Sequence, residues 1–422
     1  MANLVLVGLN YRTAAVDVRE RLNVPDAKLP NYIRSLRAIP EVEGATLLST
    51  CNRVEVIVSA RTEDVIQPIV QWLAVHAGTE ISQLENHLYI LRYGDVVKHL
   101  FRVASGLDSM ILGEPQIGGQ VRTAFRIADE MQSLDSLLRQ LFDNTMRVAK
   151  KIRTETGIGE NAVSVPYAAV ELAKKIFGDL RDLRVLLLGA GEMAELTAEH
   201  LHKHNVKQVF VANRSHDRAV ALARRFEGEA VRFDLLDHWL AACDIVISST
   251  AAPHYVIEPD QVRSALGGRR NRTLFLVDLS VPRNINPEIT KIERAYLYNI
   301  DDLQTVADAN LETRQKKAGD AEEIVSREVD AFRRRLVAQD AVPTILELQQ
   351  RLDAIRAAEL DRCLRKLGPI SAEQREAIEQ LTSQMINKIL HYPILQLKDV
   401  TTDEPRERET LRKTIRKIFG LR

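Results

Sequence analysis

A glycine-containing turn between an apolar run and a helical segment constrains the fold of this chain more than any other feature. The apolar run at residues 185–188 leads directly into Gly189-Ala190-Gly191-Glu192-Met193-Ala194. In a Gly-x-Gly-x-x-Ala turn that joins a strand to a helix, backbone N–H groups at the helix N-terminus can bind a pyrophosphate. The motif therefore predicts a dinucleotide-binding fold. The alternative is a structural turn in a sheet that binds no nucleotide.

Strand-like and helix-like segments alternate around this motif, over residues 161–309. Further strand-like runs occur at residues 209–212, 244–248 and 274–278, and segments of helical period separate them. This alternation predicts a parallel, doubly wound sheet of the Rossmann type.

The end of the second strand of this sheet indicates which dinucleotide is bound. An enzyme that uses NAD usually carries Asp or Glu there, whereas this chain has Asn213-Arg214. Arg214 offers a planar cation where a 2′-phosphate would lie, and no carboxylate would repel that phosphate. The sequence therefore favours NADPH over NADH. The alternative is that Arg214 is an ordinary surface arginine.

Cys51 is the candidate nucleophile. It lies between apolar runs that end at residue 48 and begin at residue 54, so we expect it in a polar loop rather than in a strand core. Arg53 is two residues away and would favour the thiolate, or would instead bind a substrate carboxylate. A single cysteine is more often a small buried hydrophobe. His99 lies in a helical stretch, where a lone histidine is more often structural.

The carboxy-terminal part of the chain is predicted to be helical. Residues 301–342 contain no proline and predict a helix of some 40 residues, about 60 Å long at 1.5 Å per residue. Further helical runs are expected at residues 344–367 and 371–390, separated by Gly368-Pro369. Such a long module is suited to pairing with a second copy of the chain. The alternative is a monomeric helical bundle.

The charge balance limits how the chain can meet a nucleic acid. Its 58 basic and 58 acidic residues cancel, so any RNA must be held by local basic clusters, with residues 147–153 and 333–335 as candidates. The three cysteines cannot form a disulfide framework and lack metal-ligand spacing, so no metal site is predicted. No apolar run approaches 18 residues and the amino terminus reads as a strand. A soluble, cytoplasmic protein is therefore expected.

Several motifs, spread over residues 4–393, together resemble those of the glutamyl-tRNA reductase family. They are Ser49-Thr50-Cys51-Asn52-Arg53, Ala104-Ser105-Gly106-Leu107-Asp108-Ser109, Gly113-Glu114-Pro115-Gln116-Ile117, Gly157-Ile158-Gly159 with Ala162-Val163-Ser164-Val165, Gly189-Ala190-Gly191-Glu192 and Asn213-Arg214. The carboxy-terminal third matches mainly in its helical texture and in His391-Tyr392-Pro393.

The resemblance implies an enzyme that takes glutamyl-tRNA and NADPH and releases glutamate-1-semialdehyde and free tRNA, in the first step of five-carbon-route tetrapyrrole synthesis. It implies Cys51 as the nucleophile that forms a thioester and His99 as a position important for activity. The residues expected around the glutamyl group are Thr50, Asn52, Arg53, Ser109, Glu114, Pro115, Gln116 and Gln120. Those expected around the cofactor are Gly189, Ala190, Gly191, Glu192, Met193, Ala194, Asn213 and Arg214.

The expected fold class is multidomain α/β. It comprises an α+β catalytic domain at residues 1–160, a Rossmann-like NADP-binding domain at residues 161–309, and a long helix leading to an all-α dimerisation domain at residues 310–422. The resemblance also implies a homodimer and transfer of the aldehyde to an aminomutase. Two other functions remain open: a shikimate-dehydrogenase-like NADP oxidoreductase, which would need neither Cys51 nor the long helix, and a helical or tRNA-binding scaffold without catalysis.

Overall fold

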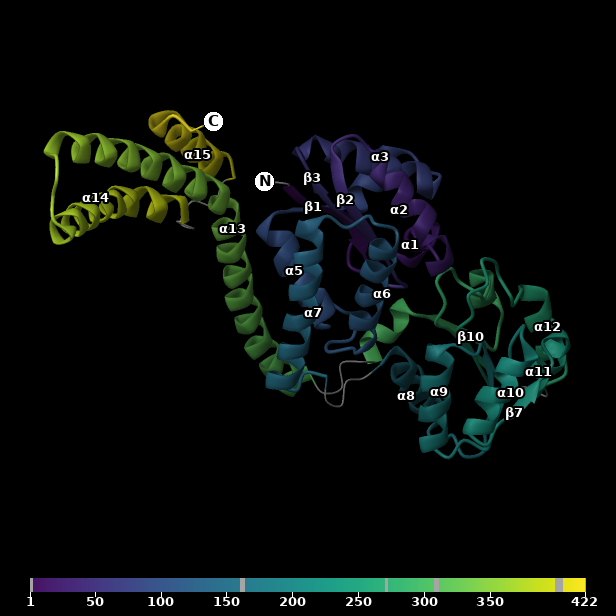
Figure 1. Cartoon of the computed structure of the whole chain (residues 1–422). Coiled ribbons are helices and arrows are strands. Elements are labelled where there is room, and N and C mark those ends of the chain that lie inside the picture. The colour runs from purple at the N-terminus through teal and green to yellow at the C-terminus, as the bar shows by residue number, and fades with distance from the viewer. Residues whose placement is uncertain (1–2, 160–163, 270–271, 307–310, 399–404, 422) are drawn as a thin grey trace. The chain divides into compact units, whose positions relative to one another are not determined.

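The computed structural model describes residues 3–159, 164–269, 272–306, 311–398 and 405–421 (Figure 1). Contacts divide the chain into two compact units, residues 2–325 and residues 326–422. The first unit contains an amino-terminal α+β fold, here residues 3–159, and a Rossmann-like dinucleotide fold, here residues 164–306. The second unit is helical. The predicted fold class is confirmed.

The amino-terminal fold is built on a four-stranded antiparallel sheet in the order β2-β3-β1-β4. The strands are β1 (Asn3–Asn10), β2 (Val42–Ser49), β3 (Arg53–Ala60) and β4 (Tyr89–Arg92). Every residue of β3 is buried, because helices and loops cover both faces of the sheet at this strand. The helices are α1 (Val16–Leu22), α2 (Leu29–Arg37), α3 (Ile66–Ala77), α4 (Ile81–Leu84), α5 (Gly94–Ala104), α6 (Gln116–Glu130) and α7 (Ser136–Thr156).

The dinucleotide fold begins with α8 (Val165–Phe177), whose first turn is capped by the side chain of Ser164. Its six strands are all parallel and lie in the order β10-β9-β8-β5-β6-β7. They are β5 (Arg184–Leu188), β6 (Gln208–Ala212), β7 (Glu229–Val231), β8 (Ile245–Ser248), β9 (Leu274–Asp278) and β10 (Ala295–Asn299). The chain reverses its direction of strand addition between β5 and β8, and ligands of such sheets bind at that point.

Alternate residues of the central strands build two separate cores. Val185 and Leu187 face one core, which α8, α9 (Glu192–Lys203) and α10 (His216–Arg225) cover. Leu186 and Leu188 face the other, which α11 (Leu236–Ala242) and α12 (Pro259–Gly267) cover. Because both faces are covered, the strands read as continuous apolar runs in the sequence. The two edge strands β7 and β10, which the sequence analysis did not predict, are shorter or partly exposed.

The helical part differs from the prediction in where its helices end. The long helix α13 runs over Leu311–Leu367 and is bent (Figure 1), so the predicted end at residue 342 is wrong: Pro343 lies inside the helix. The predicted break at Gly368 is present. The helix α14 (Ala372–Lys398) extends beyond the predicted residue 390, and α15 (Pro405–Phe419) was not predicted. Residues 307–310, part of the predicted 301–342 helix, lie outside the described residues; just before them, residues 301–306 form a 3-10 turn, η6 (Asp301–Val306).

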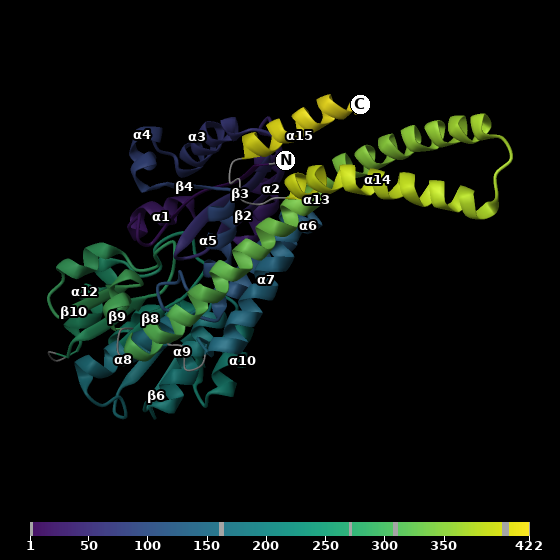
Figure 2. The same ribbon diagram turned by 90° about the vertical axis from the view of Figure 1, so that its left-hand side faces the viewer.

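Packing explains how the helix continues through Pro343. A proline inside a helix removes one backbone hydrogen bond and bends the chain. Here, α14 runs back along the second half of α13 (Figures 1 and 2). Side chains on both sides of the proline pack against α14 and α15 in one cluster, which contains Ala341, Ile345, Leu348, Leu390, Leu397 and Ile415. None of the described helices combines the length and apolar character needed to cross a membrane.

Candidate active site

Cys51 lies at the tip of a three-residue loop between β2 and β3. The hydroxyl Oγ1 of Thr50 accepts hydrogen bonds from the backbone N–H groups of Asn52 and Arg53, both at 3.1 Å. The backbone N–H of Tyr11 donates to the carbonyl of Asn52 at 2.8 Å. These bonds fix the loop so that the partly buried Cys51 side chain has a defined place next to strand β3.

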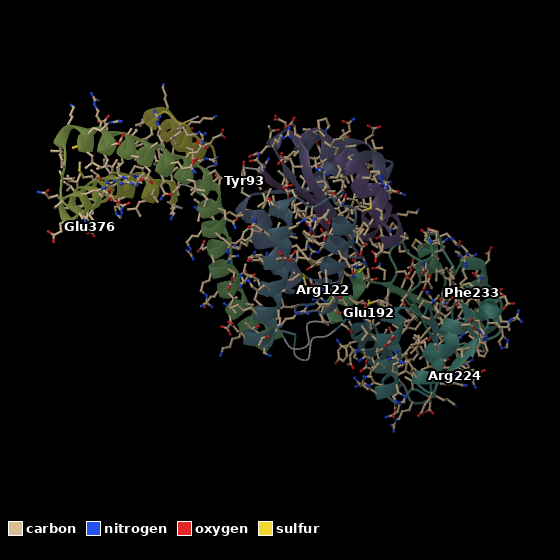
Figure 3. The ribbon with its side chains drawn as sticks, viewed as in Figure 1. Tyr93, Arg122, Glu192, Arg224, Phe233 and Glu376 are labelled. Atoms are coloured by element: carbon tan, nitrogen blue, oxygen red, sulfur yellow. The ribbon has the colours of Figure 1, made fainter. Side chains whose placement is uncertain are left out.

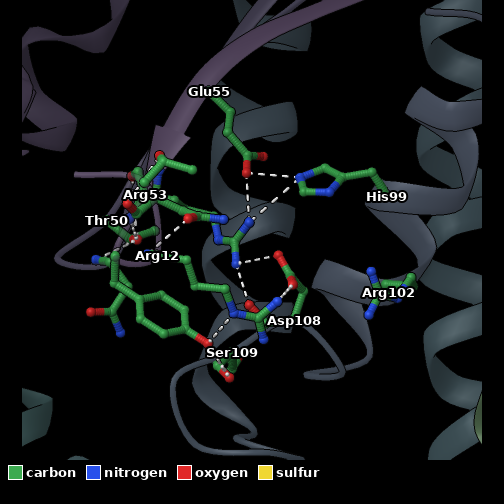
Figure 4. A network of polar contacts seen from close by, with 12 residues as sticks. Arg12, Thr50, Arg53, Glu55, His99, Arg102, Asp108 and Ser109 are labelled. Atoms are coloured by element: carbon green, nitrogen blue, oxygen red, sulfur yellow. Dashed lines mark hydrogen bonds and ion pairs between the residues drawn. The ribbon is translucent and has the colours of Figure 1, made fainter. Parts of the chain in front are cut away.

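Arg53 is the centre of a buried polar network beside this loop (Figure 4). Its Nη1 lies 2.5 Å from Oε1 of Glu55, and its Nη2 lies 3.1 Å from Oδ2 of Asp108 and also donates to the Asp108 carbonyl. His99 from α5 completes the network: its Nε2 is 2.9 Å from Glu55 Oε1 and 3.5 Å from Arg53 Nη1. The hydroxyl of Tyr89 also donates to Glu55 Oε1, at 2.5 Å.

The network keeps its charges at neutral pH. Burial by itself would lower the pKa of Arg53, but Glu55 foremost raises it above the ordinary arginine value. Burial would likewise raise the pKa of Glu55, but His99 and Arg53 hold it well below the ordinary glutamate value. The second Glu55 oxygen, Oε2, is buried and has no hydrogen-bond partner among the described residues. Arg53 is therefore a fixed, pre-oriented cation.

The environment of Cys51 corrects one expectation. Of the two roles expected of Arg53, favouring the thiolate or binding a substrate carboxylate, the first is not supported: the carboxylates of Glu55 and Asp108 hold its guanidinium, and the pKa of Cys51 is raised. Burial and the nearby Glu114 raise the pKa of the Cys51 thiol to about 12, and the cation that opposes this rise is Arg19. The free site therefore holds a neutral thiol.

The glycine-rich segment between α5 and α6 brings a second group of expected residues to this region. Gly113 has φ of +84°, and a Cβ there would lie 2.2 Å from the carbonyl oxygen of Ile158, so only glycine fits. The buried Glu114 follows directly. Burial raises its pKa to about 7; Arg53 opposes this rise and Glu192 adds to it. Glu192 begins α9 of the dinucleotide fold, on the side that faces the amino-terminal fold (Figure 3).

The remaining residues expected around the glutamyl group are less closely grouped. The carbonyl of Ser109 accepts a hydrogen bond from the Tyr11 hydroxyl at 3.2 Å. Pro115 caps the start of α6, and the Oε1 atom of Gln116 is buried without a partner in the described part of the chain. Gln120 is exposed, one turn further along α6.

The glycine turn of the dinucleotide fold has room for a bound group. Gly189 has φ of +114°, and a Cβ there would lie 2.4 Å from the carbonyl oxygen of Ser249, at the end of β8. A Cβ on Gly191 would meet nothing within 4 Å. The turn thus lies at the point between β5 and β8 where the strand order reverses, and it has open space at the N-terminus of α9. These residues fit a dinucleotide pyrophosphate.

The two predicted sites border the same hydrophobic core. Cys51 packs against the same hydrophobic cluster as Ala190 and Met193 of the glycine turn. Asn213 follows β6, and its side-chain amide donates to the Ser215 carbonyl at 3.0 Å. Arg214 is exposed. The thiol and the dinucleotide turn thus belong to the same part of the molecule, although about 140 residues separate them in the sequence.

Sequence reasoning missed several residues of the site. Glu55 lies two residues from Arg53 in β3, whereas Tyr89 and Asp108 reach the network only through the fold. Arg12 lies 3.0 Å from Asp108. Glu55 did carry a signal, because it is a charged residue that interrupts the apolar run of residues 54–58. Arg19 carried none.

The parallel Rossmann-like sheet, with open backbone at its glycine turn, places the chain among proteins with a dinucleotide-binding fold. Comparison with known proteins narrows this class. Residues 7–156 match the family model described as the glutamyl-tRNA(Glu) reductase N-terminal domain, and residues 320–421 match that family's dimerisation domain. Residues 171–306 match the model for shikimate/quinate 5-dehydrogenase, so the shikimate-dehydrogenase alternative is a relative of the dinucleotide fold only.

Relatives over the full chain give the same result. The glutamyl-tRNA reductase of Desulfatibacillum aliphaticivorans is 46% identical over 99% of this chain and 96% of its own length. That of Syntrophobacter fumaroxidans is 46% identical over 94% of this chain and 87% of its own. A solved structure of glutamyl-tRNA reductase from Methanopyrus kandleri covers 100% of both chains, with 34% identity and a TM-score of 0.50. The chain belongs to the glutamyl-tRNA reductase family, whose members catalyse the first step of tetrapyrrole synthesis.

Proposed function

We propose that this chain converts glutamyl-tRNA to glutamate-1-semialdehyde and free tRNA, with NADPH as the reductant and a thioester on Cys51 as the intermediate. The observation that carries this proposal is that Cys51 packs against the same hydrophobic core as Ala190 and Met193 of the glycine turn. A thioester on Cys51 would form where a bound dinucleotide can reach it.

The acyl transfer needs no reactant besides the Cys51 thiol and the glutamyl-tRNA ester. The Cys51 sulfur attacks the ester carbonyl of glutamyl-tRNA, the bond to the tRNA ribose oxygen breaks, and the thiol proton ends on the ribose hydroxyl. Because burial raises the pKa of the free thiol, we expect proton removal to accompany the attack rather than precede it. Water would have to be kept from the thioester, because it would otherwise hydrolyse it.

NADPH would supply the hydride that reduces the thioester carbonyl to the aldehyde and releases the Cys51 sulfur. In this proposal the open backbone at Gly191, with Gly189, Ala190, Glu192, Met193 and Ala194, holds the pyrophosphate. Asn213 and Arg214 hold the ribose phosphate. The exposed Arg214 side chain has no ion pair or hydrogen bond within the described residues, which supports a 2′-phosphate as its partner.

The amino-terminal fold supplies the substrate side. We assign Arg53 as the cation that orients the glutamyl group, because it is fixed by Glu55 and Asp108 before substrate arrives. His99 then acts on the placement of Arg53 and Glu55, since its ring nitrogen contacts both. The other proposed substrate-binding residues are Thr50, Asn52, Ser109, Glu114, Pro115, Gln116 and Gln120.

The remaining parts of the proposal concern assembly. We propose domains at residues 1–160, 161–309 and 310–422, and a cytoplasmic homodimer formed through the last of these. Large apolar side chains exposed on α14, among them Leu381 and Met385, support a shared helical interface. Transfer of the aldehyde to an aminomutase, and tRNA contacts near residues 147–153 or 333–335, belong to the same proposal.

Incubation of the protein with glutamyl-tRNA, with and without NADPH, tests the proposed function. Without NADPH, we expect release of deacylated tRNA and a glutamyl adduct on Cys51 that mass spectrometry detects. With NADPH, we expect the semialdehyde. Cys51→Ser should lose both reactions by several orders of magnitude, since a hydroxyl without a base is a poor nucleophile. Substantial turnover by this variant would exclude the thioester mechanism.

A further inference from the structure

The short helix α1 of the amino-terminal fold forms two ion pairs with residues of the dinucleotide fold. The first is formed by Arg19, whose side chain is fully buried. Its Nη2 lies 2.6 Å from Oδ1 of Asp301, in the turn that follows strand β10, and its Nη1 lies 3.4 Å from the Ala14 carbonyl. A buried arginine that pairs with a residue 282 positions later ties these two segments together.

The second pair joins Glu20 to Arg283, in the loop after strand β9. Nε and Nη2 of Arg283 lie 3.1 and 2.7 Å from the two carboxylate oxygens of Glu20, and the Arg283 backbone N–H also donates to Glu20, at 3.2 Å. Both side chains are only 18% exposed. This bidentate geometry fixes orientation as well as distance.

The helix end also connects the dinucleotide fold to the cysteine loop. The amide Nδ2 of Asn23 donates to the Val281 carbonyl at 2.9 Å, and its Oδ1 accepts from the hydroxyl of Ser49 at 3.2 Å. Ser49 is the last residue of β2 and stands two positions before Cys51. Arg19 is in addition the cation that acts on the Cys51 thiol. The contacts to the dinucleotide fold thus converge on the loop that holds the nucleophile.

We propose that Arg19 and Glu20 are positioning residues that hold the dinucleotide fold against the Cys51 loop during hydride transfer, with Asp301 and Arg283 as their partners. This inference rests on the proposed function. The contact of Glu20 with Arg283 would fix where the bound cofactor lies relative to the thioester, whereas the residues assigned to the glutamyl group all belong to the amino-terminal fold.

The ion pairs contribute mainly orientation to this contact. Removing two charges from water costs nearly as much as their attraction returns, so ion pairs at an interface contribute orientation more than net affinity. Apolar packing supports the same contact, because Val16 of α1 lies in one core cluster with residues of the dinucleotide fold.

The test measures the two half-reactions separately in the full-length protein. Glu20→Arg places two cations opposite each other, and Glu20→Gln removes the charge at constant size. We expect each variant to reduce semialdehyde formation with NADPH about 10- to 100-fold, the usual effect of a small misplacement of reacting groups. Deacylation of glutamyl-tRNA without NADPH should stay within about twofold of the wild-type rate.

The charge-swapped variant Glu20→Arg/Arg283→Glu provides the rescue and should recover most of the reduction. Glu43→Arg is the matched control, because Glu43 forms an exposed pair with Arg61 within the amino-terminal fold. A parallel fall of both half-reactions in Glu20→Gln, unchanged reduction in Glu20→Arg, or no recovery in the swapped variant would overturn the proposal. If wild-type protein showed no Cys51-dependent deacylation, the proposed function itself would fail, which is a different outcome.

Discussion

Replacement of Glu114 by glutamine tests the electrostatics of the site directly, because the side chain keeps its size and loses its charge. Burial raises the pKa of Glu114 from 4.5 to about 7, against the influence of Arg53 and with a contribution from Glu192. The folded protein therefore holds this proton more tightly than the unfolded chain. The ionised carboxylate costs stability, and this cost grows as the pH rises from about 4.5 to about 7 and is constant above that.

The two pKa values set the size of the effect. At about 1.4 kcal/mol for each pKa unit, the raised pKa of Glu114 lowers the unfolding free energy by about 1 kcal/mol at pH 5 and by about 3 kcal/mol at pH 8. Glutamine carries no such cost at either pH. Between pH 5 and pH 8, the wild-type protein should thus lose about 2 kcal/mol of unfolding free energy relative to Glu114→Gln. Other titrating groups, such as Asp278, are common to both proteins and cancel.

Tryptophan fluorescence can measure this loss of unfolding free energy in the amino-terminal fold, which contains Glu114. The chain has two tryptophans, Trp72 in the amino-terminal fold and Trp239 in the dinucleotide fold. In a Trp239→Phe background, urea unfolding reported by Trp72 therefore measures the fold that contains Glu114. Glu130→Gln, at an exposed position on α6, is the control and should leave the pH dependence unchanged. Equal pH dependence in wild type and Glu114→Gln would refute the reasoning.

Three further substitutions test the cofactor site, the buried network and the assembly. Arg214→Ala should weaken NADPH binding by about 1.5 to 3 kcal/mol and NADH binding little, by fluorescence titration; equal losses would contradict the 2′-phosphate assignment. Glu55→Gln leaves Arg53 short of a buried anion and should lower the unfolding free energy by about 3 kcal/mol in urea titrations, and a loss below about 1 kcal/mol would mean that Asp108 alone compensates. Leu381→Asp with Met385→Asp puts charges on the exposed apolar face of α14 and should shift the protein to monomer in light scattering, whereas a persistent dimer would exclude that face as the interface.

The sequence by itself determined the features that depend on neighbouring residues. The turn at Gly189 follows from local geometry, because a strand, a positive-φ glycine and a helix N-terminus within ten residues define one structure. The four inner strands of the dinucleotide fold could also be predicted from the sequence. Both of their faces are buried, so each strand is a continuous apolar run. The placement of Cys51 in a loop between two strands also followed from the runs on either side.

Contacts between residues far apart in the sequence decided the polar network of the site, the length of α13 and the ion pairs of α1. The sequence placed Arg53 beside Cys51, but only the fold brings Asp108 to its guanidinium, and this converts a presumed activator of the thiol into a fixed cation held by carboxylates. Likewise, Pro343 ends a helix by local rules, yet packing of α14 and α15 carries α13 past it. The ion pairs of α1 join residues more than 260 positions apart. Such pairings depend on the free energy of the whole folded chain, which no local pattern of residues records.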